Sequence, residues 1–380
     1  MPAAGLKDGV TILPLWALHW LSYATRPRYQ DDLLDVYLHW ALSRYIGLFE
    51  HLDEGFPLPR LTLSDAGRRI RGNQRRVTSE EMGIGFGALL ANRWFKQTGA
   101  AGLPVSIVDV DAALDDRYIF AGGSRHAVRA VKDRRPDYLL IAPDPSSRRR
   151  YRVRVLECKG TSSSTSYAVC QLASAAEQLT GITVGGRVPK GLAVSTVTMN
   201  DQLSYLAIDP EEDDAEPSYP VNADMIGQAA GFRFQDNVAD VPPILLTNAS
   251  LRASWAALAD FSGNLPALDR WAPGVMRRRL ARQQRQRVTF DTPYGLARGT
   301  SVTMDIGGQR LQIRYAADAV IDQQMTSQPE AIADAQLAFA ERIAADDDLS
   351  DDASMTTGMQ TEAGLFSATS DGSIFSIRME

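Results

Sequence analysis

The sequence predicts an α/β protein in which a mixed sheet is flanked by helices, with a helical region before it and an α+β region after it. Residues 137–142 and 149–159 are rich in β-branched and aromatic side chains, which predicts two strands. The turn residues P-D-P-S-S at 143–147 separate them and predict a hairpin. Segments 78–96 and 168–179 have helical character and lie on either side of the hairpin in the chain.

Residues 1–76 are expected to form a helical N-terminal region. Within 31–50, apolar side chains recur at three- and four-residue intervals, which is the spacing of an amphipathic helix. The apolar run 10–21 is interrupted by Pro14 and is too short to cross a bilayer. It also lacks the basic leader and cleavage site of a secretory signal, so we expect a cytoplasmic protein that does not contact a membrane.

Residues 77–208 are expected to form the central α/β unit. In the helix predicted at 78–96, Thr78 and Glu81 have the spacing of a capping box. The alternating glycines of 83–87 favour close packing of this helix against a neighbour. The other strands of the unit are predicted at 103–110, 118–121, 191–199 and 205–208.

An acidic linker at 209–222 is expected to connect the central unit to a C-terminal α+β region, 223–380. Turn signals and apolar periodicity predict the elements of that region. In order, these are helices within 245–290, the last at 274–287; a hairpin at 294–317 turning at 307–308; an amphipathic helix at 328–345; a flexible acidic segment at 346–362; and a final hairpin at 364–379 turning at 371–372.

Charged side chains are expected to meet at one end of the first hairpin. Side chains alternate between faces along a strand, so Val155, Glu157 and Lys159 share one face. Asp137 begins the neighbouring strand, and in a hairpin the start of the first strand lies near the end of the second. Two carboxylates and one ammonium therefore converge at the end of an otherwise apolar face.

Such a cluster has a chemical use. Two carboxylates a few Å apart repel one another unless a cation lies between them, and Mg²⁺ (or Mn²⁺) binds through oxygen ligands alone. The adjacent lysine would orient or help deprotonate an attacking water, and the cation would offset the charge that develops on a phosphodiester. These residues predict hydrolysis of a nucleic-acid backbone.

At these residues the chain resembles the PD-(D/E)xK, or restriction-endonuclease-like, nuclease superfamily. Pro136-Asp137 matches the first motif and Glu157-Cys158-Lys159 matches the second. The resemblance covers roughly residues 77–210 and implies a restriction-endonuclease-like core, for which helix, strands, helix, strand is the expected order. It also implies that Asp137, Glu157 and the backbone carbonyl of Cys158 hold the metal, with Lys159 acting on the water.

An exposed ion pair is the alternative explanation for an E-x-K sequence on a strand. Only five of the 40 basic residues are lysines, yet a strand that already carries Arg152 and Arg154 has a lysine at position 159. The use of lysine at position 159, on a strand whose other basic residues are arginines, and the apolar face of the strand both favour a catalytic role over an exposed ion pair. The dipeptide Pro143-Asp144 repeats the first motif within the turn, where aspartate is common, so Asp137 is the preferred ligand.

Two further site residues follow from the resemblance. Many members of the superfamily carry a glutamine on the helix after the second motif, which is Gln171 or Gln178 in this chain; Gln171 is preferred because it is nearer the helix start. Many also carry a glutamate on the helix before the sheet, and Glu80 or Glu81 has that place. Helix capping is the alternative role for Glu81.

The charge distribution is compatible with a nucleic-acid partner. The net charge is −6, but the segments 209–216 and 346–352 carry eleven acids, so the remainder of the chain carries +5. Arginine clusters at 68–76, 148–154 and 277–287 could neutralise phosphates, although charge runs are commonly solvated faces. The candidate nucleic-acid contacts are Arg75, Arg76, Arg149, Arg150, Arg278 and Arg282.

The expected function is a metal-dependent nuclease, with DNA the preferred substrate; the restriction or phage-defence type rests on the resemblance. A homodimer is plausible because cutting a duplex usually takes two sites, and a defence complex is another expected partner. The alternatives are a catalytically silent nucleic-acid-binding or scaffolding protein on the same fold, or a nuclease subunit activated by a partner. The four histidines lack the spacing of a zinc site, and Cys158 and Cys170 indicate a reducing compartment.

Overall fold

The chain forms two compact units, each of which is considered by itself. The first contains the described residues up to Pro220, and the second contains those from position 255 onward. The computed structural model describes residues 3, 6, 9–10, 12, 14–25, 40–41, 44–52, 60–100, 105–111, 114, 118–121, 124–145, 147–199, 203–210, 218–220, 255–272, 286–306, 309–348, 360–361, 364–369 and 371–379.

The first unit begins with helix α1 (Pro14–Thr25), whose first residue is the proline that interrupts the apolar run. Proline suits this position because it has no N–H to leave unsatisfied. The helix predicted over 31–50 is wrong at its end, where β1 (Phe49–Leu52) pairs with β2 (Arg60–Leu63). Apolar periodicity cannot anticipate that Phe49 contacts Phe86 on a later helix, with ring centroids 6.0 Å apart.

Helix α4 (Gly72–Phe95) is longer than predicted, and α3 (Asp65–Arg69) precedes it. The predicted capping box is wrong, because Thr78 is buried in the interior of α4. The arginine cluster at 68–76 begins at the end of α3 and continues into the first turns of α4. A π-helical turn, η3 (Lys96–Ala100), follows α4.

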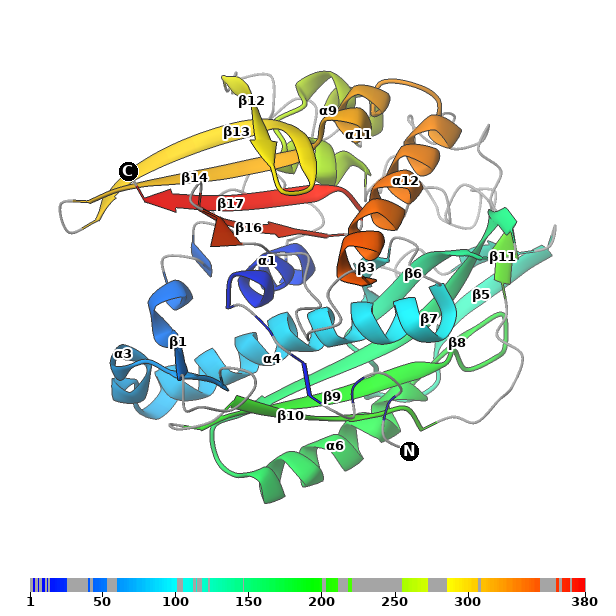
Figure 1. Cartoon of the computed structure of the whole chain (residues 1–380). Helices are drawn as coiled ribbons and strands as arrows, with labels where there is room; N and C mark the ends of the chain where they lie inside the picture. Colours follow the sequence, from blue (N-terminus) through cyan, green and yellow to red (C-terminus); the bar gives the residue numbers. More distant parts are fainter. Residues whose placement is uncertain are drawn as a thin grey trace. The chain divides into compact units, whose positions relative to one another are not determined.

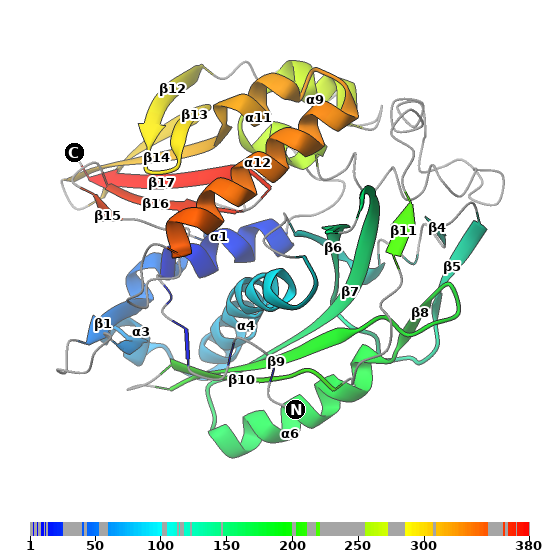
Figure 2. The same cartoon turned by 45° about the vertical axis from the view of Figure 1, so that its right-hand side comes forward.

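The main sheet of the first unit has the strand order β10-β9-β7-β6-β3 (Figure 1). All neighbours in it are antiparallel except β7 and β9, which are parallel and are connected through α6 (Thr165–Leu179). Figure 2 shows α4 and α6 on opposite sides of β7 and β9. The strands are β3 (Ser106–Asp109), β6 (Tyr138–Asp144), β7 (Ser147–Thr161), β9 (Gly191–Thr198) and β10 (Leu203–Ile208); β11 (Ser218–Pro220) pairs with the first half of β7.

The predicted hairpin is confirmed, but both strands extend into the predicted turn, so that only positions 145 and 146 separate β6 from β7. A smaller sheet contains β4 (Tyr118–Ala121), β5 (Ser124–Ala130) and β8 (Ile182–Val184). The first of these was predicted, whereas β5 was missed because polar and charged residues interrupt its apolar pattern, and β8 was missed because it has only three residues.

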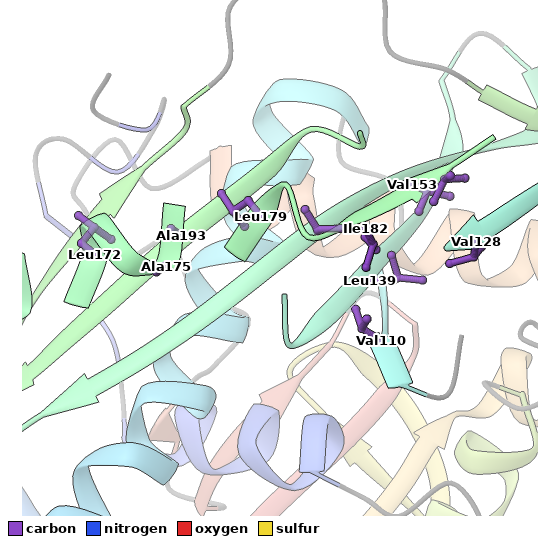
Figure 3. Packing of buried hydrophobic residues seen from close by; sticks show 11 residues of the cluster. Val110, Val128, Leu139, Val153, Leu172, Ala175, Leu179, Ile182 and Ala193 are labelled. Carbon is purple, nitrogen blue, oxygen red and sulfur yellow. The ribbon is translucent and has the colours of Figure 1, made fainter. Parts of the chain in front are cut away.

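The two faces of β7 pack against different helices, as the alternation of its side chains predicts. Val153 and Val155 belong to a buried apolar cluster with Leu172 and Leu179 of α6 and with residues of β5 and β8 (Figure 3). On the other face, α4 comes so close that a Cβ added to Gly87 would lie 2.6 Å from the Cys158 sulfur. The expected role of the glycines of α4 in close packing is therefore confirmed.

The second unit contains an antiparallel sheet of order β12-β13-β14-β17-β16-β15 (Figure 1). Its two predicted hairpins and its amphipathic helix are confirmed. The helix extends through Asp348 into the segment predicted to be flexible. Residues 287–290 form part of a strand where helix was expected. The elements are β12 (Arg287–Thr292), β13 (Gly295–Ile306), β14 (Gln309–Asp318), β15 (Gln360–Thr361), β16 (Gly364–Ala368), β17 (Ser373–Met379), α9 (Leu265–Trp271), α11 (Ala319–Gln324) and α12 (Pro329–Asp348). Within the described residues, no helix is long and apolar enough to cross a membrane.

Candidate active site

The hairpin register places the two predicted acidic ligands opposite each other. The first pair of the β6–β7 ladder is Tyr138 with Leu156, so Asp137 lies opposite Glu157, just before the ladder begins. The Oδ2 atom of Asp137 accepts a 2.9 Å hydrogen bond from the Cys158 N–H. The Asp137 N–H donates to the Leu156 carbonyl at 3.1 Å. The backbone of β7 therefore binds both the carboxylate and the backbone N–H of Asp137. Asp137 and Glu157 are called the carboxylate pair below.

Glu157 is a fully buried acid on the face of β7 that α6 covers. Lys159 Nζ contacts its Oε1 atom, and the lysine side chain remains 27% exposed. Within the described part of the chain, neither carboxylate oxygen of Glu157 has a hydrogen bond of regular geometry. A buried acid with so few donors is costly unless it is protonated or a cation approaches it.

The pKa values of the carboxylate pair reflect this environment. Burial, and then the negative charge of Asp137, raise the pKa of Glu157 to about 8. Burial also raises the pKa of Asp137, but the Cys158 N–H and the charge of Lys159 oppose this shift. Without a cation, Glu157 is therefore mainly protonated at neutral pH.

The backbone supplies a third oxygen beside the carboxylate pair. In a strand, the N–H and C=O of one residue point to the same edge, because a hydrogen-bonded pair exchanges both bonds with one partner. The Cys158 carbonyl therefore points to the edge of β7 where its N–H meets Asp137. The carbonyl of the next residue, Lys159, points to the opposite edge and accepts a 3.4 Å bond from Thr196 of β9.

These atoms fit the predicted metal. Two carboxylates and a carbonyl are oxygen ligands of the kind that Mg²⁺ and Mn²⁺ bind. A divalent cation would also satisfy the buried oxygens of Glu157 and remove the need for its proton. Among the described residues, no group of three or more His, Cys, Asp and Glu side chains is placed to hold a metal ion, so the carbonyl is needed to complete a protein ligand set of three.

The structure brings Gln171, rather than Gln178, towards the predicted catalytic lysine. Ser195 of β9 is the register partner of Lys159 in the parallel ladder, and its hydroxyl donates a 3.3 Å hydrogen bond to Gln171 Oε1. Gln178 instead donates to the Arg135 carbonyl at 3.1 Å. Sequence reasoning missed Ser195, which is a fully buried hydroxyl on β9, next to Thr196 of the same strand.

The glutamates of α4 have other partners. Arg44 is the charge that acts on Glu81, and burial raises the pKa of this glutamate. Glu80 is exposed and lies 3.8 Å from Arg76. Neither glutamate is among the groups that shift the pKa values of the carboxylate pair.

A third acid near the carboxylate pair was not predicted. Asp109 ends β3 and is the register partner of Tyr138, and its negative charge contributes to the raised pKa of Asp137. Its exposed side chain accepts a 2.7 Å hydrogen bond from the Asp111 N–H. The sequence signal that could have identified Asp109 was an acidic residue near the end of the strand predicted at 103–110.

The other candidate aspartate lies at the opposite end of the hairpin. Asp144 is the last residue of β6, is buried and pairs with Arg152 at 3.3 Å. At about 3.3 Å per residue, the seven positions from Asp137 to Asp144 span roughly 23 Å. Asp144 is therefore separated from Glu157 and Lys159 by the length of the strand.

The arginines of β7 do not lie beside the carboxylate pair. Arg154 is buried, with its guanidinium 4.5 Å from the ring centroids of both Trp94 and Phe95. Arg152 donates a 3.0 Å hydrogen bond to the Gly99 carbonyl. The expectation that this cluster lies next to the site and contacts phosphate is therefore wrong for these two residues, because the end of α4 and the turn after it cover them.

Of the remaining predicted nucleic-acid contacts, the structure describes the side chains of only some. Arg76 is exposed on α4, where it pairs with Asn73 at 3.0 Å, and Arg75 is half-buried on the same helix. The backbone of Arg149 and Arg150 lies in the first half of β7, and their side chains lie outside the described residues. Arg278 and Arg282 also lie outside the described residues.

Comparison of the chain with family models, curated proteins and solved structures finds no match. The candidate active site therefore depends on its own geometry and on the sequence motif. Its members are the carboxylate pair, the Cys158 carbonyl, Lys159 and Gln171.

Proposed function

We propose that the first unit is a metal-dependent nuclease that hydrolyses phosphodiester bonds, with DNA as the expected substrate and Mg²⁺ or Mn²⁺ as the cofactor. The observation that carries this proposal is the carboxylate pair, in which a buried acid faces a second acid in register while Lys159 contacts it. Burial raises the pKa of both acids, and the negative charge of Asp137 raises that of Glu157 further. Two buried acids with raised pKa values are the expected cost of a cation site.

The topology of the first unit supports a restriction-endonuclease-like core as the finer fold assignment. The order α4, β3, β6, β7, α6, β9 has the helix, strands, helix, strand sequence expected of that core. Three antiparallel strands are followed by a crossover helix and a strand parallel to the last of them. The motif residues lie where the first strand of the hairpin begins and the second approaches its end.

Each residue of the site has a definite role in this proposal. Asp137, Glu157 and the Cys158 carbonyl would hold the cation, which would supply positive charge against the phosphodiester under attack. With a cation as the partner of Glu157, the ammonium of Lys159 would donate hydrogen bonds that orient the water; only its neutral amine form would accept a proton from that water. Gln171 has its Oε1 atom engaged by Ser195, so its amide N–H groups are left to donate to acceptors such as phosphate oxygens.

Cleavage of circular DNA tests the proposal. Circular single-stranded and supercoiled duplex DNA are incubated with the pure protein in Mg²⁺, Mn²⁺ or EDTA, alongside Asp137→Asn and Lys159→Ala. Asp291→Asn is the matched control, because Asp291 is an exposed aspartate on β12 of the second unit. We expect metal-dependent nicking by wild type and by the control, and none by the two site variants. Equal nicking by all four proteins would show that the cleavage comes from elsewhere.

A second function is favoured by one specific observation. The ammonium of Lys159 already contacts Glu157, so the site in its present geometry has a positive partner without a metal. This arrangement suits a silent nucleic-acid-binding or scaffolding protein, or a nuclease subunit that a partner activates. Calorimetric titration with Mn²⁺ separates the three functions. A silent protein does not bind the ion through Asp137, whereas a partner-activated subunit binds it through Asp137 and cleaves poorly alone.

A further inference from the structure

Two segments far apart in the sequence form a basic surface on the first unit. One is the end of β5 with the connection to β6, and the other is the turn between β8 and β9. Pairing of β5 with β8 brings them together: Arg129 is the register partner of Thr183, and the Gly185 N–H donates to the Ala127 carbonyl at 3.0 Å. The basic surface consists of Arg129, Lys132, Arg134, Arg135, Arg187 and Lys190, and Asp133 is the only acid within these two segments.

Several of these charges have no structural use. Arg129 and Arg187 are exposed, and within the described residues neither side chain forms an ion pair or a hydrogen bond. Lys132 differs, because its ammonium donates to Thr180 at 2.6 Å and thereby helps to end α6. Arg135 pairs with Asp111 at 2.7 Å, and Arg134 donates a 3.3 Å hydrogen bond to Ser174. The positive charges of Arg129 and Arg187 are left uncompensated by these contacts, which favours an anionic partner.

The basic surface reaches the candidate active site from both segments. Arg135 lies two positions before Asp137, at the entry to β6. The Lys190 carbonyl accepts a 2.9 Å hydrogen bond from the Val155 N–H, two positions before Glu157 on β7. A chain of phosphates that passes through the site could therefore continue over this surface.

We propose that the basic surface binds the phosphate backbone of the nucleic acid on which the site acts. The inference rests on the proposed function and adds to it the place where the substrate lies outside the site. It also replaces Arg152 and Arg154 of β7, which the end of α4 and the following turn cover, as phosphate contacts near the carboxylate pair. Neutralisation of phosphates by arginine and lysine releases counterions and makes binding salt-dependent without regard to sequence.

The test measures binding without cleavage. Fluorescence anisotropy of a labelled duplex is recorded in EDTA between 50 and 200 mM salt for wild type and for Arg129→Gln/Arg187→Gln. The control is Arg298→Gln/Arg310→Gln, which removes the same charge from exposed positions of the second unit. Lys132 is left unchanged because of its contact with α6.

Each lost phosphate contact contributes about 0.9 to the slope of log Kd against log salt. Arg129→Gln/Arg187→Gln is therefore expected to lower this slope by about 2 and to weaken binding roughly 10- to 100-fold at 0.1 M salt. The control should bind as wild type does. Equal weakening in both double variants, an unchanged slope, or no binding by wild type would overturn the inference. Altered binding in a protein that never cleaves would leave the basic surface in place while the proposed hydrolysis fails.

Discussion

The charge on Glu157 should make the first unit less stable as the pH rises, and Glu157→Gln should remove most of that dependence. The pKa of this acid is raised to about 8 in the folded protein, whereas the ordinary value is 4.5. The folded state therefore holds the proton more tightly than the unfolded state does. By linkage, the contribution of Glu157 to the free energy of unfolding is constant below pH 4.5. It falls as the pH rises from 4.5 to 8 and is constant again above pH 8.

The size of the effect follows from the same values. A shift of 3.5 pH units, at about 1.4 kcal/mol per unit, corresponds to about 5 kcal/mol lost between pH 4.5 and pH 8 in the absence of metal. Glutamine has nearly the same shape and carries no charge at any pH. We therefore expect wild type to lose several kcal/mol more than Glu157→Gln over this range, and to regain stability when Mg²⁺ is added.

Denaturation in EDTA measures this difference. Urea unfolding is followed at pH 5 and pH 8.5 by hydrogen exchange of peptides from β7, since the chain has two units and a single transition cannot be assumed. Glu177→Gln is the matched control, because Glu177 is an exposed glutamate on α6. Wild type and the control should show the same pH dependence. If Glu157→Gln shows that dependence too, the buried charge does not have the assigned cost.

Three further predictions concern packing near the site. Gly160→Ala should lower the thermal midpoint and destabilise the first unit by about 2 kcal/mol or more, because the added Cβ would lie 1.8 Å from a backbone oxygen of α4. In the control Gly47→Ala the added Cβ meets nothing within 4 Å, so the thermal midpoint should change little. Arg154→Ala should cost about 2 kcal/mol in urea unfolding and leave the salt slope of DNA binding unchanged, since this arginine packs between aromatic rings; a lower slope would contradict that placement. Ser195→Ala should slow cleavage while changing stability by only about 1 kcal/mol and leaving DNA affinity as in wild type; an unchanged rate would argue against its role in orienting the site.

The local features of the first unit could be predicted from the sequence. Strand alternation placed Val155 on the apolar face of β7, and the predicted hairpin placed Asp137 near the end of the second strand. The exact pairing of Asp137 with Glu157 was not predicted, because the register shifts between Pro143 and Asp144 and the turn residues do not indicate this irregularity. The same local reasoning failed for Thr78, because a capping box has the correct spacing even where the helix has already begun.

Contacts between distant segments could not be predicted. Asp109, Ser195 and the basic surface come near the site only when β3, β9 and β8 pair with strands that are far away in the chain. The burial of Arg154 was not anticipated, because a run of arginines does not show which of them a helix will cover.

The sequence by itself determined which residues alternate along β7 and that the acids lie at the same end of the hairpin, because strand alternation and hairpin connectivity are local properties of the chain. The register that sets Asp137 opposite Glu157 was decided by the irregularity between Pro143 and Asp144. The tertiary structure alone decided which charges are buried, which hydroxyl supports Gln171 and which arginines remain without partners. These properties depend on long-range packing, in which burial and the neighbouring charges set the free energy of each ionised group.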